Sequence, residues 1–478
     1  MVFSSSVFLF VFLPVVLGLY YIIPEKHVRN AILILVSLLF YAFGEPFVVF
    51  LMVISIIINY FLGLLMQKQQ IQKLILIISV IWNLGLLGIY KYAGFFVEIL
   101  NHVKFFHFPV PEIALPIGIS FFTFQAMSYV IDLYRKEIPV QKNFFNLLLY
   151  ITFFPQLIAG PIVKYKDIIL QLDKRPVDTR QIAQGIRRFI FGLSKKLLIA
   201  DIVSIPVDHI FTLKNQELTC LLAWLGAICY TIQIYFDFSG YSDMAIGLGH
   251  MFGFSFKENF NYPYSSANMT DFWRKWHISV STWFKEYLYF PLGGNRKGKI
   301  RTVINKWIVF FFTGLWHGAN WTFVIWGLLN GGFLMLEGMN IIPVKKMQKN
   351  LFLKIISHVY TLAVVILCFT IFRAEHVTQG LHFWRTMFGF GIADEIHQKI
   401  GMSLFLKELN PLFLITMLVA MIFSMPIKNW IIQALQNANH KIKIFAQTSS
   451  YMISLGLLLI CLLYLSSGTY SPFIYLNF

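Results

Sequence analysis

The chain has 478 residues, of which 58% are hydrophobic, 17% aromatic and only 13% charged. A soluble domain carries roughly 25% charged residues. This composition therefore excludes a water-soluble enzyme, and it also excludes a disordered or fibrous chain. The four cysteines form no CxxC pair, so we expect neither a disulfide framework nor a metal site. The sequence predicts an all-helical protein that crosses a lipid bilayer several times.

Lys and Arg outnumber Asp and Glu by 39 to 22, which gives a net charge of +17. In a membrane protein such an excess marks cytoplasmic loops and does not require a nucleic acid partner. Lys26 and Arg29 follow the first apolar stretch and place the N-terminus outside. Lysines within 428–443 precede the last apolar stretch, whereas residues 444–478 carry no charge. We therefore expect the C-terminal tail on the outer side.

Crossing the hydrocarbon core takes about 20 apolar residues per helix. The first stretch, Val2–Ile23, lacks the basic start and the cleavage site of a signal peptide, so we expect it to be retained. Glu45 and Pro46 divide residues 31–66 into two spans, and the prolines within 144–163 favour a re-entrant segment. The remaining candidates are 74–90, 113–131, 187–210, 218–236, 241–256, 307–336, 355–372, 409–427 and 451–465. Together these stretches predict about ten to twelve transmembrane helices.

His317 lies inside a long stretch without Asp, Glu, Lys or Arg. An ionisable group in an apolar span is costly and indicates a functional site. A lone histidine in such a place can also be a hydrogen-bonded core residue. Gly314 and Gly318 flank it at a spacing that lets a neighbouring backbone or a substrate approach closely. Burial would keep the imidazole neutral, the form that a general base needs.

Residues 268–284 combine aromatic and polar side chains. A helix starting at this point would place Trp273, His277, Val280 and Phe284 on one face. We therefore predict one helix at the membrane interface. His277 is either a second polar group of a buried site or a residue that holds the helix in place.

Two further polar segments flank these histidines in the sequence. Arg296, Lys297, Lys299 and Arg301 form a glycine-flanked basic loop, which is either a solvated cytoplasmic loop or a binding site for the phosphates of an anionic donor. The segment from Asp237 to Asp243 could bind a cation or a sugar. We favour a structural role, in which these carboxylates satisfy a broken helix and pair with an arginine.

Together these motifs resemble the membrane-bound O-acyltransferase (MBOAT) family, in particular its bacterial branch that acetylates alginate and peptidoglycan. The resemblance covers nearly the whole chain, through Trp276-His277-Ile278-Ser279, the basic loop and Trp316-His317-Gly318. It implies a bundle of transmembrane, re-entrant and interfacial helices around a central tunnel. It also implies that His317 is the catalytic histidine and that His277 fills the family's second polar position.

The tail Phe473-x-Tyr475-x-x-Phe478 is similar to the acyl motif of the small single-helix protein that accompanies teichoic-acid D-alanyl transfer. An aromatic tail can also simply lie at the membrane interface. The resemblance implies an acyltransferase core over 1–445, followed over 446–478 by a terminal helix and an extracytoplasmic tail. Tyr475 would then be the acyl acceptor.

The expected function is transfer of acetyl from cytoplasmic acetyl-CoA, a co-substrate, across the bacterial cytoplasmic (inner) membrane for O-acetylation of a cell-surface polysaccharide. No bound cofactor is expected. Because no secreted hydrolase-like part is present, the final transfer would need an extracytoplasmic SGNH or esterase-like partner. The alternatives are D-alanyl export from a carrier protein, a lipid acyl donor, and a transporter or flippase without covalent chemistry.

Overall fold

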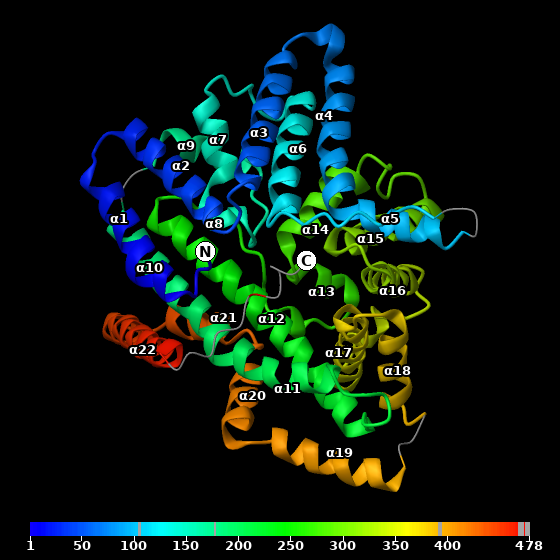
Figure 1. The fold of residues 1–478 in the computed structure, drawn as a ribbon. Coiled ribbons are helices and arrows are strands. Elements are labelled where there is room, and N and C mark those ends of the chain that lie inside the picture. The colour runs from blue at the N-terminus through cyan, green and yellow to red at the C-terminus, as the bar shows by residue number, and fades with distance from the viewer. Residues whose placement is uncertain (104–106, 176–177, 391–393, 467–472, 474–478) are drawn as a thin grey trace. The chain divides into compact units, whose positions relative to one another are not determined.

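The computed structural model describes residues 1–103, 107–175, 178–390, 394–466 and 473. Within these residues the chain forms helices and no strands (Figure 1), which confirms the predicted fold class. The contacts divide the chain into two compact units. The first comprises Met1–Phe189 with Tyr241–Glu258, and the second comprises Ile190–Gly240 with the described part of 259–474.

The first unit contains α1 (Leu13–Ile22), α2 (Lys26–Ala42), α3 (Val48–Leu65), α4 (Gln72–Leu87), α5 (Ala93–Asn101), α6 (Ile119–Tyr134), α7 (Phe144–Thr152), α8 (Phe154–Leu157) and α9 (Tyr165–Asp173). The boundary between the units falls inside α10 (Thr179–Lys195) and α12 (Cys220–Met251). The second unit contains α11 (Asp201–Phe211), α13 (Met269–Lys275), α14 (Ile278–Phe284), α15 (Lys299–His317), α16 (Trp321–Gly338), α17 (Leu351–Arg373), α18 (Val377–Met387), α19 (Glu395–Glu408), α20 (Pro411–Phe423), α21 (Ile427–Gln436) and α22 (His440–Ser466). Single π-helical turns lie at η1 (Phe8–Phe12), η3 (Gly88–Tyr92), η4 (Lys196–Ala200) and η6 (Lys285–Tyr289), and short 3₁₀ turns at η2 (Gln69–Ile71), η5 (Pro263–Ser265) and η7 (Lys346–Gln348).

Five helical segments in the described part of the chain are long and apolar enough to cross a membrane. They are Val48–Leu65, Gln69–Asn101, Cys220–Met251, Leu351–Arg373 and His440–Ser466. The pair α19 and α20 would add a sixth if it is one span bent by 71°. The protein is therefore a multi-pass membrane protein, and the larger count of ten to twelve spans stays a prediction.

In the first unit, an amide pair joins two of these apolar segments. The side-chain nitrogen of Asn83, on α4, donates to Oδ1 of Asn59, on α3, over 2.9 Å, and a reciprocal bond spans 3.3 Å. The hydroxyl of Ser79 donates to the same Asn59 oxygen. Inside a bilayer, polar side chains must find their partners within the protein. These bonds therefore fix the pairing of α3 with α4.

The structure confirms the break at Glu45 and Pro46, which lie between α2 and α3, and it breaks the 144–163 segment at Phe153. The prediction of separate helices over 218–236 and 241–256 is wrong, because α12 continues without a break from the first range into the second and ends at Met251. The acidic residues that suggested a broken helix lie inside it.

Their charges are compensated by neighbouring helices, so they need no break in the backbone. In the first unit, Arg188 lies 2.8 Å from Asp243. In the second unit, Lys196 lies 2.7 Å from Asp237. The predicted pairing with an arginine is confirmed for Asp243, whereas Asp237 pairs with a lysine and the predicted break in the helix is wrong.

The uncharged stretch 307–336 forms a helical hairpin, α15 and α16, which lie side by side in Figure 1. A Cβ atom added at Gly314 would lie 2.3 Å from the carbonyl oxygen of Phe323, and one added at Gly327 would lie 2.3 Å from that of Phe310. No side chain fits at such distances, so the two glycines allow the backbones to pack directly against each other. This contact fixes the position of the end of α15, where His317 lies.

Candidate active site

His317 is the last residue of α15, and its side chain is buried. The imidazole lies against two aromatic rings at nearly right angles. The ring of Trp326, on α16, is 5.0 Å away at 90°, and the ring of Phe372, on α17, is 5.2 Å away at 81°. The hairpin and α17 thus fix the orientation of the imidazole within an apolar environment.

The structure corrects the prediction of one continuous helix over 268–284. Helix α13 ends at Lys275, α14 begins at Ile278, and His277 lies between them with φ of 42° and ψ of 56°. This left-handed conformation is uncommon for a residue with a side chain. The predicted face that joined Trp273, His277 and Val280 therefore does not exist, and His277 lies instead at the junction of two short helices.

Asn259 determines which ring nitrogen of His277 carries the proton. Its Oδ1 lies 3.1 Å from His277 Nδ1, and it also accepts bonds from the backbone N–H and the hydroxyl of Ser279. Because a backbone N–H can only donate, the Asn259 atom at this point is the oxygen. Nδ1 of a neutral His277 therefore carries the hydrogen, and the lone pair is on Nε2, which is buried.

The two predicted histidines converge on Trp316. The ring centroid of Trp316 lies 4.9 Å from that of His317 and 5.9 Å from that of His277. His277 lies outside the five candidate spans. Burial lowers its pKa well below the ordinary value, and His317 lowers it further. His277 is therefore a neutral imidazole at neutral pH, which is the form able to accept a proton.

One face of α16 connects these elements. Trp326, Asn330 and Glu337 recur at spacings of four and seven, so they lie along one stripe of the helix. Trp326 contacts His317, and Oδ1 of Asn330 accepts a bond of 3.2 Å from the indole of Trp273, on α13. The same helix thus contacts His317 and the helix that leads to His277.

Glu337 binds the start of α13. Its carboxylate accepts bonds from the backbone N–H of Met269 over 2.7 Å and of Thr270 over 3.0 Å, and from the Thr270 hydroxyl over 2.8 Å. A carboxylate at a helix N-terminus satisfies donors that the helix leaves unpaired. Sequence reasoning missed this residue, although its position as the acidic residue that ends the uncharged stretch was an available signal.

The basic loop lies far from His317, at the opposite end of α15. Arg296, Lys297, Lys299 and Arg301 are exposed. Lys299 begins α15 and His317 ends it, so the two ends of this 19-residue helix are about 27 Å apart. The loop itself is held by Asn305, whose side chain donates to the carbonyl of Gly294 over 2.9 Å.

The tail is described at one position only. Tyr475 and Phe478 lie outside the described residues, so their predicted roles stay predictions. Phe473 is buried, and its ring lies 4.7 Å from the ammonium of Lys196.

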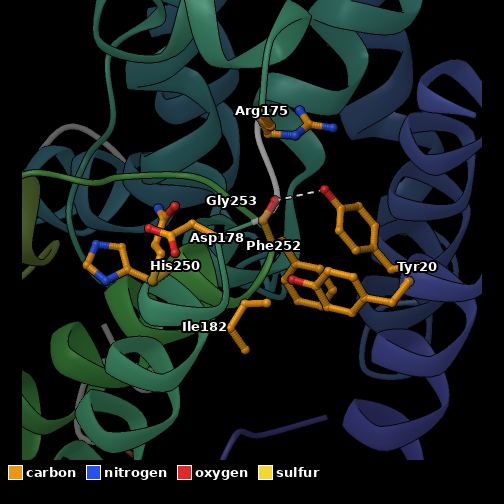
Figure 2. A pocket seen from close by; sticks show the side chains of 9 residues that line it. Tyr20, Arg175, Asp178, Ile182, His250, Phe252 and Gly253 are labelled. Atoms are coloured by element: carbon orange, nitrogen blue, oxygen red, sulfur yellow. Dashed lines mark hydrogen bonds between the residues drawn. The ribbon is translucent and has the colours of Figure 1, made fainter. Parts of the chain in front are cut away.

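A pocket in the first unit contains none of the predicted site residues (Figure 2). Several of its polar groups are bonded within the protein. The hydroxyl of Tyr20 donates to the carbonyl of Phe252 over 2.9 Å, and the guanidinium of Arg175 donates to the carbonyl of Gln171 over 3.0 Å and lies 4.3 Å from the ring of Phe254. These contacts hold the pocket walls together and suggest a structural role for its arginine.

Comparison with known proteins identifies the family of the chain. The model of the MBOAT, membrane-bound O-acyltransferase, family matches residues 67–377. The chain belongs to this family. It is an O-acyltransferase, and both histidines, Asn259 and Glu337 lie within the matched MBOAT region.

This MBOAT chain has relatives whose names refer to alginate, peptidoglycan or teichoic acid. It is 44% identical to the probable alginate O-acetylase AlgI of Pseudomonas aeruginosa, over 82% of this chain and 75% of that protein. It is 35% identical to the peptidoglycan O-acetyltransferase of Helicobacter pylori, over 100% of this chain and 98% of that protein. The teichoic acid D-alanyltransferase of Bacillus subtilis is 29% identical over only 46% of this chain and 58% of that protein.

Replacing Asn259 should alter acyl transfer through His277. Asn259→Ala removes the oxygen that fixes the tautomer, and we expect the rate to fall at least about tenfold. Asn259→Asp keeps an oxygen at this position but adds a negative charge, which favours the imidazolium and raises the pKa of His277. The acidic limb of the rate-against-pH profile should therefore move to higher pH, as measured with purified protein.

Asn295→Ala, in the exposed basic loop, is the matched control and should leave the profile unchanged. A full rate for Asn259→Ala, together with an unshifted profile for Asn259→Asp, would show that His277 does not act through this bond.

Proposed function

We propose that this protein transfers acetyl from acetyl-CoA for O-acetylation of a cell-surface polysaccharide, and that it does so in the bacterial cytoplasmic membrane. The observation that carries the proposal is the pair of buried histidines around Trp316, within a member of a family of O-acyltransferases. The acetyl group and the polysaccharide acceptor are suggested by the alginate and peptidoglycan relatives.

In the proposed mechanism His317 acts as the general base. It takes the proton of an acceptor hydroxyl while the oxygen attacks the carbonyl carbon of the thioester. The tetrahedral intermediate collapses, the carbon–sulfur bond breaks, and the thiolate of CoA leaves. The imidazolium of His317 returns its proton to that thiolate. The products are an acetyl ester and free CoA, and His317 is again neutral.

His277, whose ring also lies near the indole of Trp316, would assist the reaction. With the proton fixed on Nδ1 by Asn259, its Nε2 can accept a hydrogen bond but cannot donate one. This suits a role in holding a hydroxyl group or a protonated partner in the orientation that the reaction requires. Its contribution should therefore be smaller than that of His317, which carries the proton in the proposed mechanism.

Tyr475 is the acceptor that we propose for the first transfer. The ordinary pKa of a tyrosine is about 10, so its phenol needs a base at neutral pH. The acetyl-tyrosine would be a covalent intermediate, and an extracytoplasmic SGNH or esterase-like partner would move the acetyl group to a sugar hydroxyl.

D-alanyl export from a carrier protein is the second candidate. It is favoured by the Bacillus subtilis relative, but that match covers less than half of this chain, whereas the two O-acetylating relatives cover most or all of it. Acetyl transfer is therefore the better supported reaction.

We expect His317→Ala to lower acetyl transfer from labelled acetyl-CoA by about 10²–10⁴-fold, because the step loses its general base. The exposed His376 provides the matched control, and His376→Ala should keep the normal rate. Both variants should be produced in the membrane at the level of the unchanged protein. Near-normal turnover by purified His317→Ala would remove this residue from the mechanism.

The basic loop can bind the phosphates of the donor only if these lie far from the thioester, since about 27 Å of α15 separates it from His317. Changing Arg296, Lys297, Lys299 and Arg301 to Gln should then raise the KM for acetyl-CoA several-fold and change kcat less.

A second exposed basic cluster offers a control of similar charge. The same change at Lys345, Lys346 and Lys349 should leave the KM unchanged. If both sets of variants keep the KM of the unchanged protein, the loop does not bind the donor and only sets the topology of the chain.

Tyr475→Phe should abolish polysaccharide acetylation in cells, because it removes the nucleophilic oxygen and keeps the ring. Mass spectrometry after incubation with labelled acetyl-CoA should find the label on the C-terminal peptide of the unchanged protein and not on that of the variant. Tyr470→Phe, in the same tail, is the control and should keep the label. Normal acetylation by Tyr475→Phe cells would assign the acceptor hydroxyl to a partner or to the sugar itself.

A further inference from the structure

Lys196 lies between two carboxylates in the second unit. Its ammonium is 2.7 Å from Oδ1 of Asp201, on α11, and 2.7 Å from Oδ1 of Asp237, on α12. The three side chains are only 2%, 4% and 2% exposed. Burying charges is costly unless each charge is well paired. This cluster is therefore a built feature of the interior and not a chance surface contact.

The C-terminal tail contributes an aromatic ring to this cluster. Phe473 is 1% exposed, and its ring centroid lies 4.7 Å from Nζ of Lys196. A cation within about 6 Å of an aromatic centroid is attracted by the negative face of the ring, and the attraction strengthens where water is excluded. Phe473 is therefore a third partner of an ammonium that already contacts two carboxylates.

Helix α22 precedes the tail, and only 11% of its candidate span is buried. One of its buried residues is Cys461, whose sulfur lies 3.4 Å from the hydroxyl of Ser194. Ser194 is two positions before Lys196. Two separate parts of the C-terminal segment thus contact the same short stretch of chain.

We propose that the cluster of Lys196, Asp201 and Asp237 is the docking site of the C-terminal tail, which it binds through the ring of Phe473. The contact itself uses neither the donor nor the Tyr475 hydroxyl, so the docking does not depend on the proposed function. If Tyr475 is the acceptor, the anchor limits how far a residue two positions beyond Phe473 can reach. The cluster then positions the acceptor without touching the reacting atoms.

The docking can be tested by measuring how fast a cysteine in the tail reacts with a maleimide. Ser471→Cys is introduced into the full chain together with Cys220→Ser, because Cys220 is exposed and the other three cysteines are buried. Phe473→Leu keeps the apolar volume, loses the aromatic face and leaves the charge cluster intact. We expect it to increase the labelling rate about 3- to 30-fold, the range that a cation–π contact supports.

Phe473→Trp retains an aromatic face and should keep the labelling slow. Lys195→Met, a charge change one position from Lys196, should also leave the labelling slow. Equal rates for the unchanged chain and Phe473→Leu would overturn the proposal, because the ring would then contribute nothing to docking.

A photoreactive phenylalanine analogue at position 473 gives an independent measurement. The adduct should be found on the peptides that contain Lys196 or Asp237, and adducts on other peptides alone would overturn the proposal. Neither experiment uses acetyl-CoA. A chain that docks its tail but transfers no acetyl group would therefore refute the proposed function and leave this inference standing.

Discussion

The close approach of α15 and α16 is the constraint on which the arrangement of the site depends. Gly314 and Gly327 present no side chains at their contact, so each backbone packs against a carbonyl of the other helix. A larger residue at either position would push the helices apart and move Trp326 away from His317. It would also move Asn330 and Glu337, through which α16 binds α13. One backbone contact therefore determines the surroundings of both histidines.

The sequence was sufficient for the class of fold, and it singled out the two histidines as candidates, but it did not give the local geometry that joins them. Composition alone indicates a helical membrane protein, and an ionisable group in an apolar stretch singles out His317. The continuous helix predicted around His277 failed because a helical pattern of side chains cannot reveal one left-handed residue. Its partner Asn259 is 18 positions away in the chain, a separation that no local pattern detects.

Buried polar groups show the same limit of sequence reasoning. Asp237 and Asp243 suggested an interrupted helix, yet α12 is continuous because Lys196 and Arg188 neutralise them from other helices. Glu337 ends an apolar stretch and could have been taken for a simple boundary, although it binds the start of α13. A sequence shows where a charge lies along the chain, but only the fold shows which partner compensates it.

The conformation of His277 is held by contacts with its surroundings. A left-handed backbone costs a residue with a side chain about 1 kcal/mol or more, so it persists only where surrounding contacts enforce it. Here the Asn259 oxygen contacts both the imidazole and Ser279, and these bonds compensate part of that cost. The same contacts fix the tautomer and the ring orientation next to Trp316 before any substrate binds. Such preorganisation benefits a reaction because the cost of orientation is met during folding and not during each turnover.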